Sequence, residues 1–393
     1  MQNRDRGLST AVATALLAVG MTMPATADEP RAGHDGKKHF LSGSGHKLNI
    51  GGQYQQRFVF NTSDARDETN LDGFEIRRAK LALSGHLASP ALEYDLVMAH
   101  SRSSGNTFLE DAYVGYEFGN GMTVTAGRFK LPFLYEELLS SKRQLAVDRG
   151  LTTEFFTLNR AEQIQLGLSP SDALKLRVAF SDGANTNSSG ATTDPAEYAV
   201  TLRAQSNLAG EWGQMKDLVA HGDDFAAFVS GAVHIESQEG EGADELLAWT
   251  VDGIVKTGNL SLLGAVIGAS GDTDDRSQLG ILAQAGFSLS PQLQPYVRLD
   301  QIDYDDACDA VTALTAGFNY YLNKHSAKLT TDVVYVLSHG TLAPQDEHSE
   351  PQKPSGVPGL NGGEFSSGIG LSSAQLNGDD PQIAVRAQLQ LLF

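Results

Sequence analysis

Cysteine and long apolar runs are scarce in this chain of 393 residues. Its single cysteine, Cys308, cannot form a disulfide within the chain, so the fold is held without covalent links between distant residues. Beyond residue 27, no stretch reaches the roughly 18 consecutive apolar residues that indicate a transmembrane helix. These absences exclude a disulfide-rich scaffold and a helical membrane protein.

Positive charge is also in short supply, because 29 Lys and Arg stand against 48 Asp and Glu, a net charge of −19 at pH 7. This balance disfavours nucleic acid, whose phosphates require a basic surface. The ten histidines have no metal-ligand spacing, and no Gly-x-Ser-x-Gly motif is present. Two aspartate clusters, within 272–275 and 303–309, lack the spacing of a calcium-binding loop. The sequence therefore predicts no enzyme, no metal site and no resident cofactor.

The first 27 residues have the pattern of a secretory signal peptide. Arg4 and Arg6 precede an apolar run over residues 11–20, and small residues at 25–27 form a cleavage site. The apolar run is too short to cross a membrane as a helix. Cleavage would remove Arg4, Arg6 and Asp5, so 27 basic and 47 acidic residues would remain, a net charge of −20. We expect the mature chain to begin with a polar leader, 28–46, that is disordered or faces a lumen.

Apolar and polar residues alternate at the C-terminus with a period of two. Ile383, Val385 and Leu389 share one face, while Arg386 and Gln388 share the other. Successive side chains of a strand point to opposite faces, so this segment separates lipid from water. Comparable segments predict sixteen strands, near 47–60, 73–87, 91–100, 108–118, 121–128, 161–169, 172–181, 195–207, 223–236, 244–256, 259–270, 277–289, 292–302, 311–322, 326–337 and 381–393.

An even number of amphipathic strands is typical of a transmembrane antiparallel β-barrel, and sixteen strands leave an aqueous lumen. The predicted barrel covers residues 47–393. Its connections alternate between short turns, such as those at 89–90, 119–121, 169–171, 258 and 290–291, and longer loops at 61–72, 129–160, 182–194 and 338–380. The connection 208–222 is longer than a turn, and we expect a brief amphipathic helix there. Alternation alone leaves a soluble β-sandwich open as an alternative.

Three stretches resemble the phosphate-selective porin O and P family: 73–85 (GFEIRRAKLALSG), 111–116 (DAYVGY), and 127–133 (GRFKLPF) followed by 136–142 (EELLSSK). The resemblance is dense from about residue 47 to 180 and weaker afterwards. It implies a sixteen-stranded barrel, usually a trimer, whose third loop folds inward and narrows the channel. In this chain that loop would be 129–160. The resemblance also implies an outer-membrane location and basic side chains along the channel.

Basic residues in the interior phase of the strands or in the loop 129–160 are the candidates for the solute path. They are Arg57, Arg78, Lys80, Lys130, Lys142, Arg143, Arg149, Arg160, Lys175, Arg177 and Arg203. Arg298 and Arg386 have the same phase, and so do four acids, Asp95, Asp111, Asp252 and Asp300. Such basic residues could also serve only to solvate the lumen or to form ion pairs. The mixed charges therefore do not establish a preference for phosphate.

These patterns predict an outer-membrane porin for small hydrophilic solutes, with anions such as phosphate as the expected cargo. Its expected partners are those solutes, outer-membrane lipid, two further copies of the chain and the barrel-assembly machinery, which would recognise the terminal Phe393. Two alternatives stay open. One is a barrel hydrolase that uses His221, His234 or His325. The other is a secreted β-sandwich binding protein.

Overall fold

The computed structural model describes residues 29–34, 38–62, 72–101, 104–184, 196–238, 245–271, 277–304, 310–338 and 382–393. The predicted signal peptide, both aspartate clusters apart from Asp303, and most of the loops 61–72, 182–194 and 338–380 lie outside these residues. No helix within the described ranges is long and apolar enough to cross a membrane.

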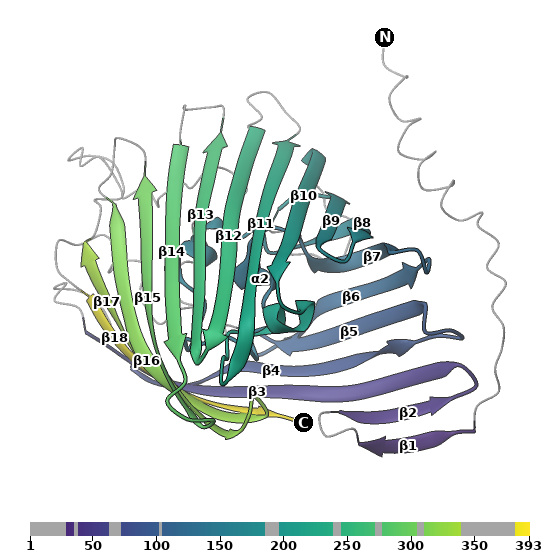
Figure 1. Cartoon of the computed structure of the whole chain (residues 1–393), viewed down its shortest axis with the longest axis horizontal. Helices are drawn as coiled ribbons and strands as arrows, with labels where there is room; N and C mark the ends of the chain where they lie inside the picture. Colours follow the sequence, from purple (N-terminus) through teal and green to yellow (C-terminus); the bar gives the residue numbers. More distant parts are fainter. Residues whose placement is uncertain are drawn as a thin grey trace, which may run out of the picture.

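Sixteen antiparallel strands, β3 to β18, close into a barrel, as predicted (Figure 1). Each strand pairs with the next one along the chain, and β18 returns to β3 with Val385 opposite Phe60. The strands are β3 (His46–Thr62), β4 (Gly73–His86), β5 (Leu92–His100), β6 (Thr107–Glu117), β7 (Met122–Lys130), β8 (Arg160–Ser171), β9 (Leu174–Ser181), β10 (Ala196–Ala209), β11 (Asp223–Gln238), β12 (Glu245–Gly258), β13 (Leu260–Gly271), β14 (Ser277–Phe287), β15 (Leu293–Tyr304), β16 (Val311–Asn323), β17 (Ala327–Ser338) and β18 (Gln382–Leu392).

The two faces of the barrel wall differ as the alternation predicts. In β12, Leu247, Trp249 and Val251 are exposed on the outer face, whereas Thr250 and Asp252 are buried on the inner face. An exposed apolar face with buried polar groups suits a wall between lipid and a polar interior. The predicted turn at 169–171 is wrong by a few residues, because β8 continues to Ser171 and the chain turns at 172–173.

The described residues of the N-terminal leader are ordered. It forms a hairpin of β1 (Arg31–His34) and β2 (His39–Gly43), with Arg31 opposite Ser42. β2 pairs with the first half of β3, from His46 to Ile50, and β18 pairs with the second half, from Gln53 onward. The expectation of a disordered leader failed because β18 leaves one edge of the first half of β3 free, and this edge offers backbone hydrogen bonds to β2.

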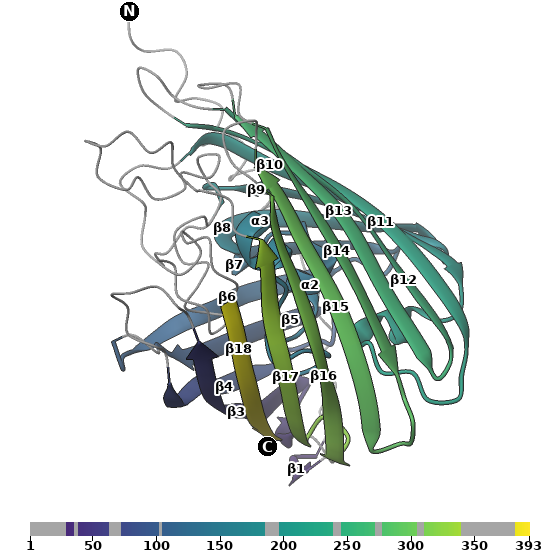
Figure 2. The same ribbon diagram turned by 90° about the vertical axis from the view of Figure 1, so that its left-hand side faces the viewer.

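The segment 131–159, between β7 and β8, lies inside the ring of strands (Figure 2). It contains two short helices, α2 (Tyr135–Leu138) and α3 (Leu151–Phe156). We call this segment the inner loop. Its apolar residues pack against small or apolar inner residues of β10 to β18, and this cluster includes Phe133, Phe155, Phe156, Ala232, Ala248, Ile267, Ile302 and Val334. These contacts hold the inner loop against one half of the barrel.

The connection 210–222 also packs against inner groups of the barrel. It contains a short 3-10 helix, η1 (Trp212–Lys216), which agrees with the brief helix expected there. Tyr135 of the inner loop donates a hydrogen bond to the carbonyl of Met215, 2.6 Å. Ser261 and Gln294, on the inner face of the wall, both donate to the carbonyl of Leu218. The inner loop and this connection therefore meet inside the half of the barrel formed by β10 to β18.

Candidate functional site

A cavity of about 580 Å³ lies between the inner loop and the wall formed by β3 to β9. No residue of β10 to β18 lines it, which agrees with the packing of the inner loop against that half. Most of the lining is polar. The charged lining residues are Arg77, Arg78, Lys80, Asp95, Glu110, Asp111, Lys130, Glu137, Lys142, Arg149, Glu154, Arg160 and Arg177.

Two β-bulges bring consecutive charged residues to the cavity. In β4, Gln55 is opposite Arg78 and Gln56 is opposite Ile76, so Arg77 is an extra residue in the strand. In β6, Val97 is opposite Asp111 and Met98 is opposite Leu109, so Glu110 is the extra residue. A bulge breaks the alternation of faces, so two adjacent residues can lie on the same side of the wall. Arg77 and Arg78 both line the cavity, and so do Glu110 and Asp111. Strict alternation of faces therefore does not predict that Arg77 and Glu110 line the cavity.

Cations outnumber carboxylates along the cavity. Eight Lys and Arg and five Asp and Glu line it, a formal excess of three positive charges. Several are paired across neighbouring strands: Arg160 lies 2.8 Å from Asp111 and 3.2 Å from Glu110, and Lys80 lies 2.5 Å from Glu110. The ion pairs fix these side chains, while the excess leaves the cavity positive.

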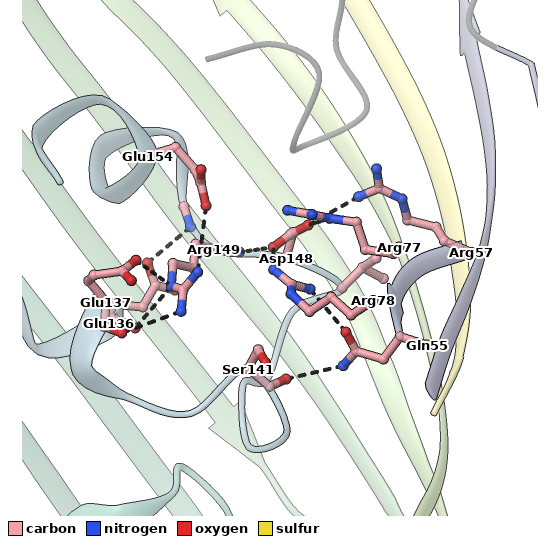
Figure 3. A network of polar contacts seen from close by, with 12 residues as sticks. Gln55, Arg57, Arg77, Arg78, Glu136, Glu137, Ser141, Asp148, Arg149 and Glu154 are labelled. Carbon is pink, nitrogen blue, oxygen red and sulfur yellow. Dashed lines mark hydrogen bonds and ion pairs between the residues drawn. The ribbon is translucent and has the colours of Figure 1, made fainter. Parts of the chain in front are cut away.

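Asp148 of the inner loop connects the loop to the arginines of β3 and β4 (Figure 3). Its Oδ2 accepts hydrogen bonds from Arg77 Nε at 2.6 Å and Arg57 Nη1 at 3.2 Å, and its Oδ1 accepts one from Arg78 Nη2 at 2.8 Å. Burial alone would raise the pKa of Asp148, but Arg77, Arg78 and Arg57 outweigh burial and hold this pKa well below its usual range. The carboxylate therefore stays ionised.

The carboxylates of Glu137 and Glu154, also on the inner loop, lie beside Arg149 (Figure 3). Arg149 Nε lies 2.8 Å from Glu137, which also lies 3.0 Å from Lys130 Nζ. Burial opposes ionisation of Glu137, but these two cations outweigh burial and lower its pKa. Burial raises the pKa of Glu154, and the charge of Asp148 raises it further. Glu154 is therefore the more easily neutralised of these two cavity carboxylates.

Lys142 and Arg177 differ from the other cavity cations. Within the part of the chain that the structure describes, neither side chain has a carboxylate within 4 Å. Lys142 lies on the inner loop and Arg177 on β9, so they come from two sides of the cavity. Their charges are therefore available to a solute.

Four predicted path residues do not line the cavity. Arg57 is buried against Asp148 and Glu75, and Arg203 is buried against Asp252 at 2.8 Å. Arg143 donates to the carbonyl of Lys216, and Lys175 lies 4.4 Å from the ring of Trp212. Periodicity finds the side of the wall on which a residue lies, but it does not show which interior residues the inner loop covers. The other seven predicted path residues, Arg78, Lys80, Lys130, Lys142, Arg149, Arg160 and Arg177, line the cavity.

The histidines considered for hydrolysis do not form an accessible catalytic site. His234 bonds Thr201 at 2.8 Å and Glu236 at 3.1 Å, an order that resembles a catalytic triad, but Thr201 and His234 are fully buried. His221 is exposed, and its backbone N–H donates to Asp223. His325 lies in the turn before β17, where burial lowers its pKa to about 3. A substrate therefore has no access to the Thr201 hydroxyl.

The terminal residue closes the barrel at the end of β18. The N–H of Gly52 donates to the carbonyl of Phe393 at 2.6 Å, and the N–H of Phe393 donates to the carbonyl of Gly52 at 3.3 Å. The ring of Phe393 lies where a Cβ on residue 52 would be, so glycine lets the ring pack directly against the backbone of β3.

A family model described as phosphate-selective porin O and P matches residues 48–352 of this chain. Among solved structures, the chain is similar to an anion-selective porin from Comamonas acidovorans, with a TM-score of 0.63 and 12% identity over 88% of this chain and 99% of that one. It is also similar to the outer-membrane channel DcaP of Acinetobacter baumannii, with a TM-score of 0.56 and 14% identity over 89% and 99% of the two chains.

Salmonella typhi OmpF, solved in complex with daunomycin, matches with a TM-score of 0.57 and 14% identity over 88% of this chain and 98% of that one. At these identities, the similarity shows a shared barrel fold. No curated protein sequence matches the chain significantly.

Proposed function

We propose a function from one premise: this chain belongs to the phosphate-selective porin O and P family. The family and the fold make it an outer-membrane β-barrel and point to a channel rather than an enzyme. The proposed function is the passive diffusion of small hydrophilic anions, such as phosphate. The proposed path is the cavity between the inner loop and β3 to β9.

The observation that carries this proposal is the sign of the charge in the cavity. Eight cations and five carboxylates line it, although the whole chain has a net charge of −19. Exposed charges farther apart than the Debye length, about 8 Å at physiological salt, are largely screened from one another. Charges that line a narrow path act on a solute at contact distance, where protein walls lower the effective dielectric. Local charge therefore decides the preference.

Phosphate is a suitable solute for this cavity because of the type of donor present. Five arginines line it, and each guanidinium presents a planar fork that matches two phosphate oxygens. The lysines add point charges that attract an anion without fixing its orientation. The anion-selective porin with a similar fold supports this choice of charge sign.

The assembly and export of the chain belong to the same proposal. We expect cleavage of residues 1–27 on export, insertion by the barrel-assembly machinery and association into a homotrimer in outer-membrane lipid. A solved trimeric form of a similar barrel, Vibrio cholerae OmpT, supports the trimer. The signal pattern at residues 1–27 supports export.

The test is the reversal potential of the purified full-length protein in a planar bilayer across a potassium chloride gradient. We expect a reversal potential whose sign shows that the channel is more permeable to chloride than to potassium. Addition of inorganic phosphate should lower the chloride current, because phosphate would occupy the same path. A potassium-selective channel, or a barrel without conductance, would contradict the proposal.

A further inference from the structure

Arg77 is held at one edge of its guanidinium. Its Nε donates to Asp148 Oδ2 at 2.6 Å, while Nη1 and Nη2 have no acceptor among the residues that the structure describes. Arg77 also lines the cavity, and 16% of its side chain is exposed. The two Nη groups of a guanidinium can donate parallel hydrogen bonds to two oxygens of one anion. The fork of Arg77 is thus available to a solute.

Asp148 is placed where it can fix the plane of that guanidinium. The carboxylate is fully buried, and the bulge in β4 brings Arg77 and Arg78 to it together. Arg78 is held from a second direction, because its Nη1 donates to Gln55, which in turn donates to the carbonyl of Ser141 (Figure 3). The backbone of Asp148 is fixed as well, since its carbonyl accepts a hydrogen bond from Arg298 Nη1 at 2.9 Å.

We propose that Asp148 is a positioning residue for oxoanion recognition, which fixes the guanidinium of Arg77 so that its two Nη groups bind a permeating phosphate. This inference rests on the proposed function and adds a named recognition group to it. Asp148 does not touch the solute. It acts through Arg77.

A carboxylate that positions arginines and a carboxylate that only contributes charge should affect channel selectivity and phosphate binding differently when they are replaced. Replacing Asp148 by Asn adds one positive charge beside the cavity, which by charge alone would increase the preference for anions. The same change leaves Arg57, Arg77 and Arg78 to repel one another, and the fork of Arg77 is no longer held. Asp148→Asn should therefore keep or increase the preference for chloride while it lowers the affinity for phosphate.

The experiment measures both quantities on the full-length protein in planar bilayers. The reversal potential in a potassium chloride gradient reports charge, and the concentration of inorganic phosphate that halves the chloride current reports recognition. For Asp148→Asn we expect an equal or greater chloride preference, together with an increase of about tenfold in the half-blocking phosphate concentration. Asp148→Glu keeps the charge and displaces the carboxylate by one methylene. It should leave the reversal potential unchanged and still weaken the block.

Two further variants identify the route of the effect. Arg77→Gln should weaken phosphate block to a similar extent, and adding Asp148→Asn to it should cause little further loss, because both substitutions remove the same interaction. Asp252→Asn is the matched control. Its buried carboxylate binds Arg203 through two hydrogen bonds, away from the cavity, so it adds the same charge without affecting phosphate block.

The outcomes distinguish failure of the proposed phosphate passage from failure of the positioning role of Asp148. A parent channel that phosphate does not block contradicts the proposed passage of phosphate, and the positioning role is lost with it. A blocked parent whose Asp148 variants bind phosphate as tightly as the parent contradicts the positioning role alone. Effects of Asp148→Asn and Arg77→Gln that add fully also contradict it, because Asp148 would then act independently of Arg77.

Discussion

Lys142 is a single residue whose environment makes the cavity charge depend on pH. Burial lowers the pKa of its ammonium group, and the positive charge of Lys38 lowers it further. The group therefore loses its proton at a lower pH than an ordinary lysine does. We expect the chloride preference to decline as the pH rises through this lowered pKa. Lys142→Arg should reduce that decline, because a guanidinium stays charged.

The measurement is the reversal potential in a potassium chloride gradient between pH 7 and pH 10. Lys216→Arg is the control, since Lys216 is exposed and does not line the cavity. Identical pH profiles for the parent and for Lys142→Arg would show that this residue does not contribute to the charge that a solute meets.

Alternation along a strand predicts only some of the residues that line the cavity. The period of two places Arg78, Lys80 and Arg177 on the inner side of the wall, and all three line the cavity. It places Arg77 on the outer face, because a bulge is a local change of register that the count of residues does not contain. The only signal in the sequence is the doublet itself. Two adjacent charges of one sign in an apolar-faced strand, as in Arg77-Arg78, indicate that one of them needs a bulge.

At the scale of elements, the sixteen strands could be predicted to within two residues at each end, because each carries its own alternation. The hairpin of β1 and β2 could not, since its two strands are only four and five residues long, carry no alternation of apolar and polar residues, and depend on the free edge of β3 as their partner. The path of the inner loop depends on contacts with strands far away in the sequence, so its composition alone does not give it. The brief helix at Trp212–Lys216 was predictable from its apolar residues.

The anchoring of the inner loop gives a prediction at this scale. Phe156 is fully buried and packs beside Gly280 of β14. Phe156→Ala should loosen the inner loop, because a buried Phe→Ala substitution costs about 3–5 kcal/mol. Barrel closure uses the strand pairs, which this change leaves intact. We expect a heat-resistant barrel whose single-channel current is larger and noisier than that of the parent.

Single-channel recordings and gel mobility of unheated samples check this prediction. Phe225→Ala serves as the matched control, because the Phe225 side chain is 57% exposed on the barrel exterior and does not contact the inner loop. A quiet channel of parental conductance from Phe156→Ala would show that the apolar cluster does not hold the inner loop in place.

At the scale of the whole molecule, the barrel is closed where β18 meets β3. Deleting Phe393 removes two backbone hydrogen bonds to Gly52 and the ring that covers this residue. We expect the truncated protein to assemble poorly in the outer membrane, as measured by the fraction of heat-modifiable barrel in membrane extracts. Phe393→Tyr, which keeps the backbone bonds and an aromatic ring, should assemble normally. Parental assembly of the truncated protein would contradict a role for the terminal residue.

We propose that the cavity selects anions although the chain as a whole is acidic. The most direct test compares reversal potentials across a potassium chloride gradient for two variants that lose the same number of charges. One changes Arg78, Lys80 and Lys142 to Gln in the cavity. The other changes Arg143, Lys175 and Lys216 to Gln outside the cavity. We predict that the cavity variant loses its chloride preference and that the second variant keeps it. Equal shifts in the two variants would contradict the claim, because the net charge of the chain would then determine selectivity.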